Sequence, residues 1–253
     1  MNDGLSETIF IFILIFCRIG ACLMFAPGLS SPRVSMPVRL IIAVAITAAL
    51  SPLIWPEILA VATATDQADR PFLLLSEILA GSAIGIMARC FILALQFAAT
   101  AAANLIGLAG IPGIPLEDTD TGSPLASLAS VAAVMLIMHV GLHIELLEAI
   151  IESYHALPPS RDIPIDGYFR SLLGTIAEAW RLALQLSAPF IAYAIIVNFA
   201  LGLANRFAQQ ISIYHATTGA VILGGFMLAS LVWIDWLFIF LESYRYWLQN
   251  GGF

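Results

Sequence analysis

No proline interrupts 72-FLLLSEILAGSAIGIMARCFILALQFAATAAANLIGLAGI-111, a run of 40 mostly apolar residues. A helix rises about 1.5 Å per residue, so one straight helix here would be about 60 Å long, roughly twice the thickness of a bilayer core. Glu77, Arg89, Gln96 and Asn104 break the apolar pattern. The run therefore predicts a helix that either bends back or projects beyond a membrane. Its charges must face something other than lipid, because charge at membrane depth is costly.

Similar apolar segments lie on both sides of this run. They cover residues 8–26, 38–55, 125–151, 171–201 and 216–242. A membrane span needs about 20 apolar residues, so we expect an all-α membrane protein of about six long helices. Pro52 and Pro56 should cut the second segment short, because proline removes a helical hydrogen bond. We expect residues 1–253 to form a single domain.

The composition excludes several classes of protein. Of the 253 residues, 60% are hydrophobic and only 11% are charged, whereas soluble domains carry about 25% charged residues. All the basic residues are arginine and the formal net charge is −7, which argues against nucleic acid as a ligand and against a polybasic membrane anchor. Cys17, Cys22 and Cys90 lie inside apolar segments, without the spacing of a metal site or a disulfide framework.

Small residues recur along the central run. Gly81 and Gly85 have the Gly-x-x-x-Gly spacing that lets two helix backbones approach closely. Ordinary helix packing is the simpler interpretation of such a motif, because it occurs often by chance.

Residues 110–124, GIPGIPLEDTDTGSP, cannot form a regular helix because they contain three prolines and three glycines. A connection this long between apolar helices is uncommon and often functional. Glu117, Asp118 and Asp120 could bind a cation. A solvated acidic turn is the simpler interpretation, because a single short loop would have to supply all the ligands.

The densest polar cluster begins within the segment 125–151 and extends just beyond it. His139 and His143 are four residues apart and should share a helix face, and Glu145, Glu148 and Glu152 should share another. A metal site would need a carboxylate beside the histidine pair, and no His-Glu-x-x-His motif is present. A polar seam that faces protein or water is the simpler interpretation. We expect no metal and no cofactor.

Further charges lie in the last two apolar segments. Glu178 and Arg181 are three residues apart and can pair on one helix, and Asp235 and Glu242 are seven apart on one face. Such groups serve either as a proton relay or as polar contacts between helices or subunits. No nucleophile elbow, phosphate loop or zinc-protease motif is present, so no catalytic residue is predicted.

Three stretches spread over nearly the whole chain carry a family resemblance. They are GLH at 141–143 with ESYHALP at 152–158; APF at 188–190 with VNFALGLANR at 197–206 and QISIY at 210–214; and, more weakly, AP at 26–27 with Ser30, Ser31, Pro37 and Arg39. Together they resemble the FliR family of type III secretion export-gate proteins. The second stretch is the longest and most specific.

This resemblance implies a non-enzymatic subunit of the flagellar protein export gate. In this family one such subunit joins several copies of FliP and FliQ in a helical assembly, with FlhB around the entrance. FlhA and proximal rod proteins are further expected partners, and membrane lipid is expected around the outside of the assembly. The family's helices form bent hairpins in the inner membrane at the flagellar basal body, partly at periplasmic level. Unfolded polypeptides pass through the channel.

The resemblance also assigns site residues. In the family, the segment that matches residues 107–124 projects into the channel and helps to plug it. This role falls on Gly107, Gly110, Ile111, Pro112, Gly113, Ile114, Pro115, Leu116, Glu117, Asp118 and Asp120. The polar residues expected at subunit contacts or toward the lumen are Arg89, Glu145, Glu148, Glu152, Asn198, Asn205 and Arg206.

Two other functions stay open at this point. The first is a proton- or solute-coupled secondary transporter that uses Glu145, Glu148, Glu152 and Asp235. The second is an intramembrane metalloenzyme with His139 and His143 as ligands. A virulence-type secretion system is a further alternative to the flagellar one, although the quoted stretches look more flagellar.

Overall fold

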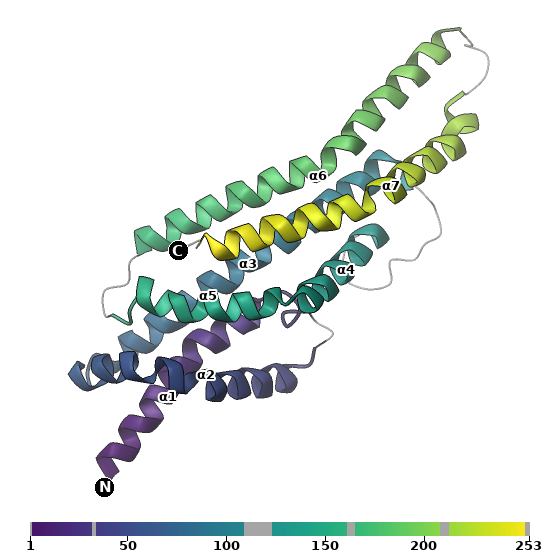
Figure 1. Ribbon diagram of the computed structural model, residues 1–253. Helices are drawn as coiled ribbons and strands as arrows, with labels where there is room; N and C mark the ends of the chain where they lie inside the picture. Colours follow the sequence, from purple (N-terminus) through teal and green to yellow (C-terminus); the bar gives the residue numbers. More distant parts are fainter. Residues whose placement is uncertain (1, 32–33, 109–122, 161–164, 208–212, 251–253) are drawn as a thin grey trace. The chain divides into compact units, whose positions relative to one another are not determined.

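The computed structural model describes residues 2–31, 34–108, 123–160, 165–207 and 213–250. Within these ranges the chain is almost entirely helical and contains no strand. The helices are α1 (Asn2–Phe25), α2 (Met36–Ala64), α3 (Arg70–Leu105), α4 (Pro124–Val140), α5 (Leu142–Ala156), α6 (Ile165–Phe207) and α7 (Ile213–Gln249) (Figure 1). The prediction of an all-α protein is confirmed.

Five helices are long and apolar enough to cross a membrane, namely α1, α2, α3, α6 and α7. The pair α4 and α5 adds a sixth if the two are counted as one bent span. Helix α3 has 36 residues and α6 has 43, so they are about 54 and about 65 Å long. Both exceed a bilayer core of about 30 Å. Because α3 runs unbroken from Arg70 to Leu105, it would project beyond a bilayer and does not fold back on itself.

The two prolines of α2 do not end that helix, so the predicted short second segment is wrong. Helix α2 continues through Pro52 and Pro56 for 29 residues. Pro52 has no N–H to donate to the carbonyl of Ala48, four residues earlier. The hydroxyl of Ser51 donates to that same carbonyl over 3.2 Å. Side-chain donors of this kind are what makes proline tolerable inside membrane helices.

A break at Gly141 divides the predicted segment 125–151. Helix α4 ends at Val140, and α5 begins at Leu142 after a bend of 72°. Gly141 has φ = 87°, a left-handed conformation that side chains with a Cβ disfavour. Helix α5 then ends at its C-cap residue Leu157, whose N–H donates to the carbonyl of Ser153 over 2.8 Å.

Replacing Gly141 with alanine is expected to destabilise the protein by about 1–2 kcal/mol, the cost of a Cβ in the left-handed region. No atom lies within 4 Å of where that Cβ would be, so the cost comes from the backbone alone. Gly202 is equally open and lacks a positive φ, so Gly202→Ala is the matched control and should not destabilise. Thermal unfolding in mild detergent measures both. Equal midpoints for the two variants would contradict the expectation.

The described helices group into two compact units. Unit 1 comprises Met1–Cys90, Ile137–Ala177 and Tyr244–Phe253, and unit 2 comprises Phe91–Leu136 and Glu178–Ser243. Several helices contribute to both units, and the single domain over residues 1–253 stays a prediction.

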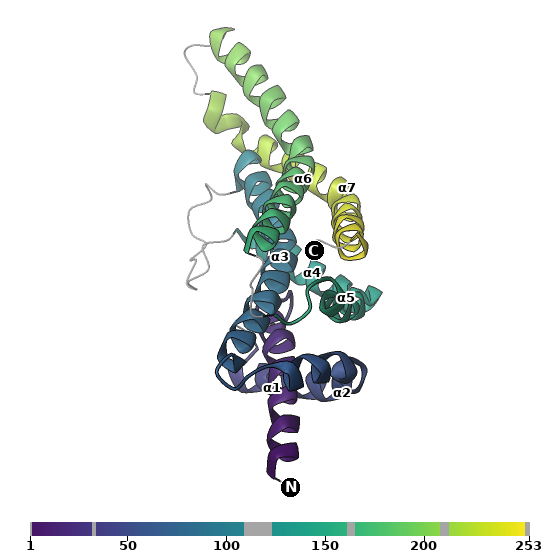
Figure 2. The ribbon, with the colours of Figure 1, turned by 90° about the vertical axis from the view of Figure 1, so that its left-hand side faces the viewer.

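In unit 1, α1 packs against α2 (Figure 2). It also makes direct backbone contact with α3. A Cβ at Gly81 would collide with the carbonyl of Arg18, and one at Gly85 would lie 2.5 Å from the carbonyl oxygen of Cys22. The Gly-x-x-x-Gly motif therefore serves helix packing within the chain. Around this crossing, the apolar side chains Leu14, Ile15, Ile19, Cys22, Ile84 and Met87 are fully buried.

In unit 2, α6 and α7 form an antiparallel hairpin (Figure 1). The Tyr193 hydroxyl donates to the carbonyl of Val221 over 2.6 Å, and the indole N–H of Trp236 donates to the carbonyl of Leu186 over 2.9 Å. Phe190 packs edge-on against Trp236, with ring centroids 5.3 Å apart. This part of the chain bears out the expected hairpin arrangement.

Candidate functional site

A buried ion pair lies within unit 1. The Arg18 guanidinium on α1 donates from Nε and Nη2 to the two carboxylate oxygens of Glu77 on α3, over 2.8 and 2.6 Å. The Arg18 and Glu77 side chains are 2% and 0% exposed. Two parallel hydrogen bonds between a guanidinium and a carboxylate form one of the strongest kinds of side-chain pair. They offset the cost of burying both charges.

The same guanidinium also holds the end of α5. Its Nη1 donates to the Ser153 hydroxyl over 3.2 Å, and its Nη2 donates to the carbonyl of Leu157 over 2.9 Å. The guanidinium carbon lies 3.9 Å from the centre of the Tyr154 ring, at a distance that gives a cation–π contact. Arg18 thus links three helices. Sequence reasoning noted Glu77 and missed its pairing with Arg18, although opposite charges in two apolar segments were a usable signal.

A second site lies in unit 2, where α3 ends. Gly107 has φ = 80°, and its N–H donates to the carbonyl of Asn104 over 3.1 Å. Ile106, fully buried, packs against Gly225 of α7 so closely that a Cβ there would overlap its side chain. At the neighbouring Gly224, a Cβ would lie 2.7 Å from the Tyr193 hydroxyl oxygen, so this glycine makes room for that side chain. The adjacent glycines of α7 therefore let α3 and α6 both approach it.

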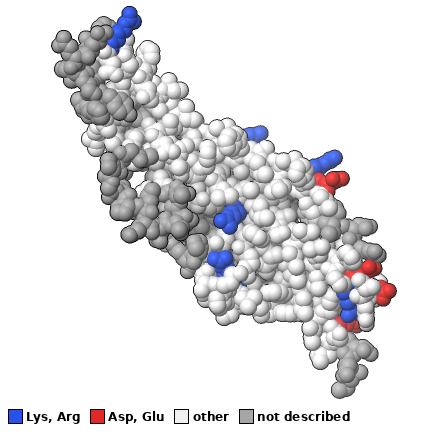
Figure 3. Space-filling model, turned by 180° about the vertical axis from the view of Figure 1, so that it is seen from behind, with Lys and Arg blue, Asp and Glu red and all other residues white. Residues whose placement is uncertain are grey.

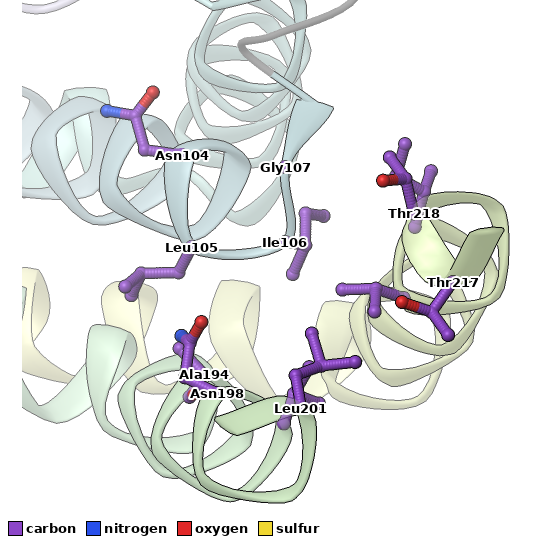
Figure 4. A pocket seen from close by; sticks show the side chains of 12 residues that line it. Asn104, Leu105, Ile106, Gly107, Ala194, Asn198, Leu201, Thr217 and Thr218 are labelled. Carbon is purple, nitrogen blue, oxygen red and sulfur yellow. Dashed lines mark hydrogen bonds between the residues drawn. The ribbon is translucent and has the colours of Figure 1, made fainter. Parts of the chain in front are cut away.

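A cavity of about 220 Å³ lies beside this turn. Figure 4 shows Ile106 pointing into the space between α6 and α7. The lining comes from the end of α3, from α6 and from α7: Asn104, Leu105, Ile106, Gly107, Ala194, Val197, Asn198, Leu201, Thr217, Thr218, Val221 and Ile222. None of these described lining residues is ionisable. The cavity can thus take up apolar groups and offer a few amide or hydroxyl contacts, but it has no acid or base for catalysis.

The predicted plug segment begins at this cavity. Gly107, its first residue, belongs to the turn and to the cavity lining. The other predicted plug residues, from Gly110 to Asp120, lie outside the described residues. The structure thus fixes where the segment leaves α3.

Most of the polar residues predicted at contacts or at a lumen are exposed. These are Arg89 on α3, Glu148 and Glu152 on α5, and Asn198, Asn205 and Arg206 on α6. Asn198 also lines the cavity, and its amide donates to the carbonyl of Ala194 over 2.8 Å. On the face seen in Figure 3, charged side chains are few and separated by broad uncharged areas. The roles of these residues stay a prediction.

Glu145 differs from the other predicted polar residues because it is half-buried and paired within unit 1. Its Oε1 accepts a hydrogen bond from Nε of Arg245 on α7 over 3.1 Å. Its Oε2 is buried without a hydrogen-bond partner among the described residues. Near the end of α5, Nε2 of His155 lies 3.5 Å from a carboxylate oxygen of Glu57, and the two side chains are 68% and 40% exposed.

The break at Gly141 corrects the interpretation of the histidines. His139 belongs to α4 and His143 to α5, and the two helices are bent by 72°. They do not share a helix face, because the four-residue spacing has that meaning only along an unbroken helix. Among the described residues, no three His, Cys, Asp or Glu side chains are grouped so that they could hold a metal ion.

The comparisons with known proteins agree over nearly the whole chain. The family model described as "Bacterial export proteins, family 1" matches residues 9–245. The chain is 26% identical to the flagellar biosynthetic protein FliR of Caulobacter vibrioides over 90% of this chain and 92% of that protein. It is 29% identical to FliR of Escherichia coli over 78% and 74% of the two chains. It is 38% identical to the secretion system apparatus protein SsaT of Salmonella typhimurium over 73 residues, which are 27% of each chain.

Proposed function

Because the chain belongs to the bacterial export proteins of family 1, we propose that it is a subunit of the export gate of a type III secretion apparatus in the bacterial inner membrane. The observation that carries this proposal is the match over residues 9–245, which overlaps each described helix that could cross a membrane. The family consists of export proteins and not of enzymes, so the prediction of a non-enzymatic protein is confirmed.

The flagellar system is the better assignment within this family. The two FliR relatives align over most of both chains, whereas the similarity to SsaT covers about a quarter of each. The sequence stretches quoted above lead to the same choice. We propose that the protein belongs to the flagellar basal body, and the family resemblance suggests that part of the assembly lies at periplasmic level.

The gate needs further polypeptides to form its channel. An α-helix with its side chains is about 10 Å wide, so a passage for a polypeptide must be at least that wide. The cavity of about 220 Å³ is far too small for that. FliP, FliQ and FlhB are the proposed neighbours, with FlhA and proximal rod proteins nearby. The exposed Arg89, Glu148 and Glu152 are proposed to face those neighbours or the lumen.

The segment from Gly107 to Asp120 is proposed to plug the channel. Support comes from its start, because Ile106 is buried against Gly225 and so fixes the point from which the segment leaves α3. Apolar side chains in the segment, at Ile111, Ile114 and Leu116, would exclude water and ions. Its glycines and prolines disfavour regular structure, so the segment could move aside for a substrate.

Two experiments test this function in the source bacterium. Removing the whole chain should abolish the appearance of flagellar proteins in the medium, and unchanged secretion would overturn the proposal. Deleting residues 110–122 should make the membrane leaky to ions, measured as loss of membrane potential with a voltage-sensitive dye. As a matched control, changing Glu117, Asp118 and Asp120 to their amides should leave the membrane sealed, because the apolar side chains form the seal. A tight membrane after the deletion would refute the plug.

A further inference from the structure

The Arg18 guanidinium makes more contacts than an ion pair needs. It donates four hydrogen bonds to described residues, all within unit 1. Two of them reach Glu77 on α3 and balance the charge. The other two reach the Ser153 hydroxyl and the Leu157 carbonyl, and the Tyr154 ring lies against the guanidinium carbon. These additional contacts all fall in the last turn of α5 and its C-cap.

Stability alone does not account for this arrangement. Replacing a buried ion pair with well-packed apolar side chains is often neutral or stabilising. Apolar contacts are not directional, so an apolar pair would define the rotation of α5 less sharply. Hydrogen bonds depend on distance and angle. The bonds to Ser153 and Leu157 therefore fix both the rotation of α5 about its axis and its place along α1.

Helix α5 needs such a contact because α4 does not set its direction. The two helices meet at Gly141 in a bend of 72°, and no atom lies within 4 Å of where a Cβ of Gly141 would be. Two other polar contacts hold α5, from Glu145 to Arg245 and from His155 to Glu57. Both are partly exposed, and exposed pairs contribute at most about 1 kcal/mol. Among the described residues, Arg18 is therefore the strongest polar restraint on α5.

We propose that Arg18 is a positioning residue of the export gate, which sets the rotation and place of α5 against α1 and α3. Export requires α5 in this position, and a folded chain with α5 displaced does not suffice. Arg18 is buried, so it acts through α5 and not by touching the exported polypeptide. The inference rests on the proposed function, because export is the activity that the position of α5 supports.

Two variants separate the position of α5 from the stability of the chain. Arg18→Lys keeps a positive charge beside Glu77, but an ammonium group lacks the planar fork of a guanidinium and should lose the contacts to Ser153 and Leu157. Arg18→Leu with Glu77→Leu removes both charges, so neither is left buried alone. Both variants should accumulate in the membrane of the source bacterium. Both should lower the secretion of flagellar proteins about tenfold or more.

A matched control removes the other polar contact in the last turn of α5. His155 lies 3.5 Å from Glu57 on α2. The double variant Glu57→Gln with His155→Gln should change secretion less than about twofold, because a partly exposed pair contributes little. It carries as many substitutions as the leucine variant, so a difference between the two belongs to the Arg18 contacts.

Hydrogen exchange in mild detergent measures the hold on α5. The Leu157 N–H donates to the Ser153 carbonyl over 2.8 Å. This bond should open more often once Arg18 no longer holds the Leu157 carbonyl, since helix ends open locally. Exchange over residues 153–157 should rise about tenfold in both Arg18 variants, while exchange around Gly85 of α3 stays unchanged. A general loss of stability would instead speed exchange in both helices.

The remaining outcomes would each overturn the positioning role. Wild-type secretion by either Arg18 variant would do so, and so would unchanged exchange at the end of α5. A loss of secretion that only matches the loss of protein from the membrane, or the failure of both variants to accumulate, would assign the cluster to folding alone. The proposed function fails separately, if removing the whole chain leaves secretion intact. Normal secretion by the variants with none after that removal would refute the positioning role alone.

Discussion

Replacing Glu77 with leucine is expected to destabilise the protein by about 3–5 kcal/mol, the usual cost of removing one partner of a buried ion pair. The Arg18 guanidinium would remain buried with no carboxylate, since Glu77 accepts two of its hydrogen bonds. Thermal unfolding in mild detergent and the amount of folded protein in the membrane measure the loss. Glu57→Gln is the matched control, because Glu57 is an exposed acid and exposed substitutions usually change stability by less than about 0.5 kcal/mol.

The double variant Arg18→Leu with Glu77→Leu should recover much of that stability. Replacing a buried ion pair with apolar side chains is often neutral. Recovery should be incomplete, because the Leu157 carbonyl and the Ser153 hydroxyl lose the donor that Arg18 provides. If the double variant is no more stable than the Glu77 variant, the two charges are not coupled and this account of the cluster is wrong.

Replacing Gly81 with alanine is expected to destabilise the protein by about 3 kcal/mol, at the upper end of the cost of overpacking. The added methyl group would collide with the backbone carbonyl of Arg18. A carbonyl cannot rotate away as a side chain can, so α1 and α3 would have to separate. That separation would also stretch the hydrogen bonds between Arg18 and Glu77.

Gly174 supplies the control for this substitution. It lies inside α6 with no atom within 4 Å of where its Cβ would be. Gly174→Ala should be neutral or stabilising by up to about 1 kcal/mol, because alanine favours a helix. Both variants are compared by thermal unfolding in detergent. A Gly81 variant that melts with the Gly174 variant would show that α1 and α3 are not in the backbone contact described.

The apolar runs predicted helices well, because about 20 apolar residues have few alternatives to a helix in a membrane. Two local predictions failed. Pro52 and Pro56 do not stop α2. At Pro52, the Ser51 hydroxyl satisfies the carbonyl of Ala48 that the proline leaves open. The helix through His139 and His143 breaks at Gly141, where the backbone is left-handed. Neither a substitute hydrogen bond nor a backbone angle is visible in apolar periodicity.

The candidate site was predicted only in part. The resemblance pointed to Gly107, and the structure places it in a turn beside a cavity. It gave no hint that Gly224 and Gly225 make room for Tyr193 and Ile106. It also did not join Arg18 to Glu77, 59 residues apart. Each of these relations depends on which helices touch.

The sequence by itself determined that the chain is helical, that it enters a membrane, and to which family it belongs. Those properties follow from composition, segment length and short-range patterns, which each stretch carries without reference to the others. Only the tertiary structure decided which charges form ion pairs within the chain, as Arg18 and Glu77 do, and which are exposed, as Asp235 is. The physical reason is that a charge in an apolar helix demands a partner, and the identity of that partner is set by contacts between helices far apart in the sequence.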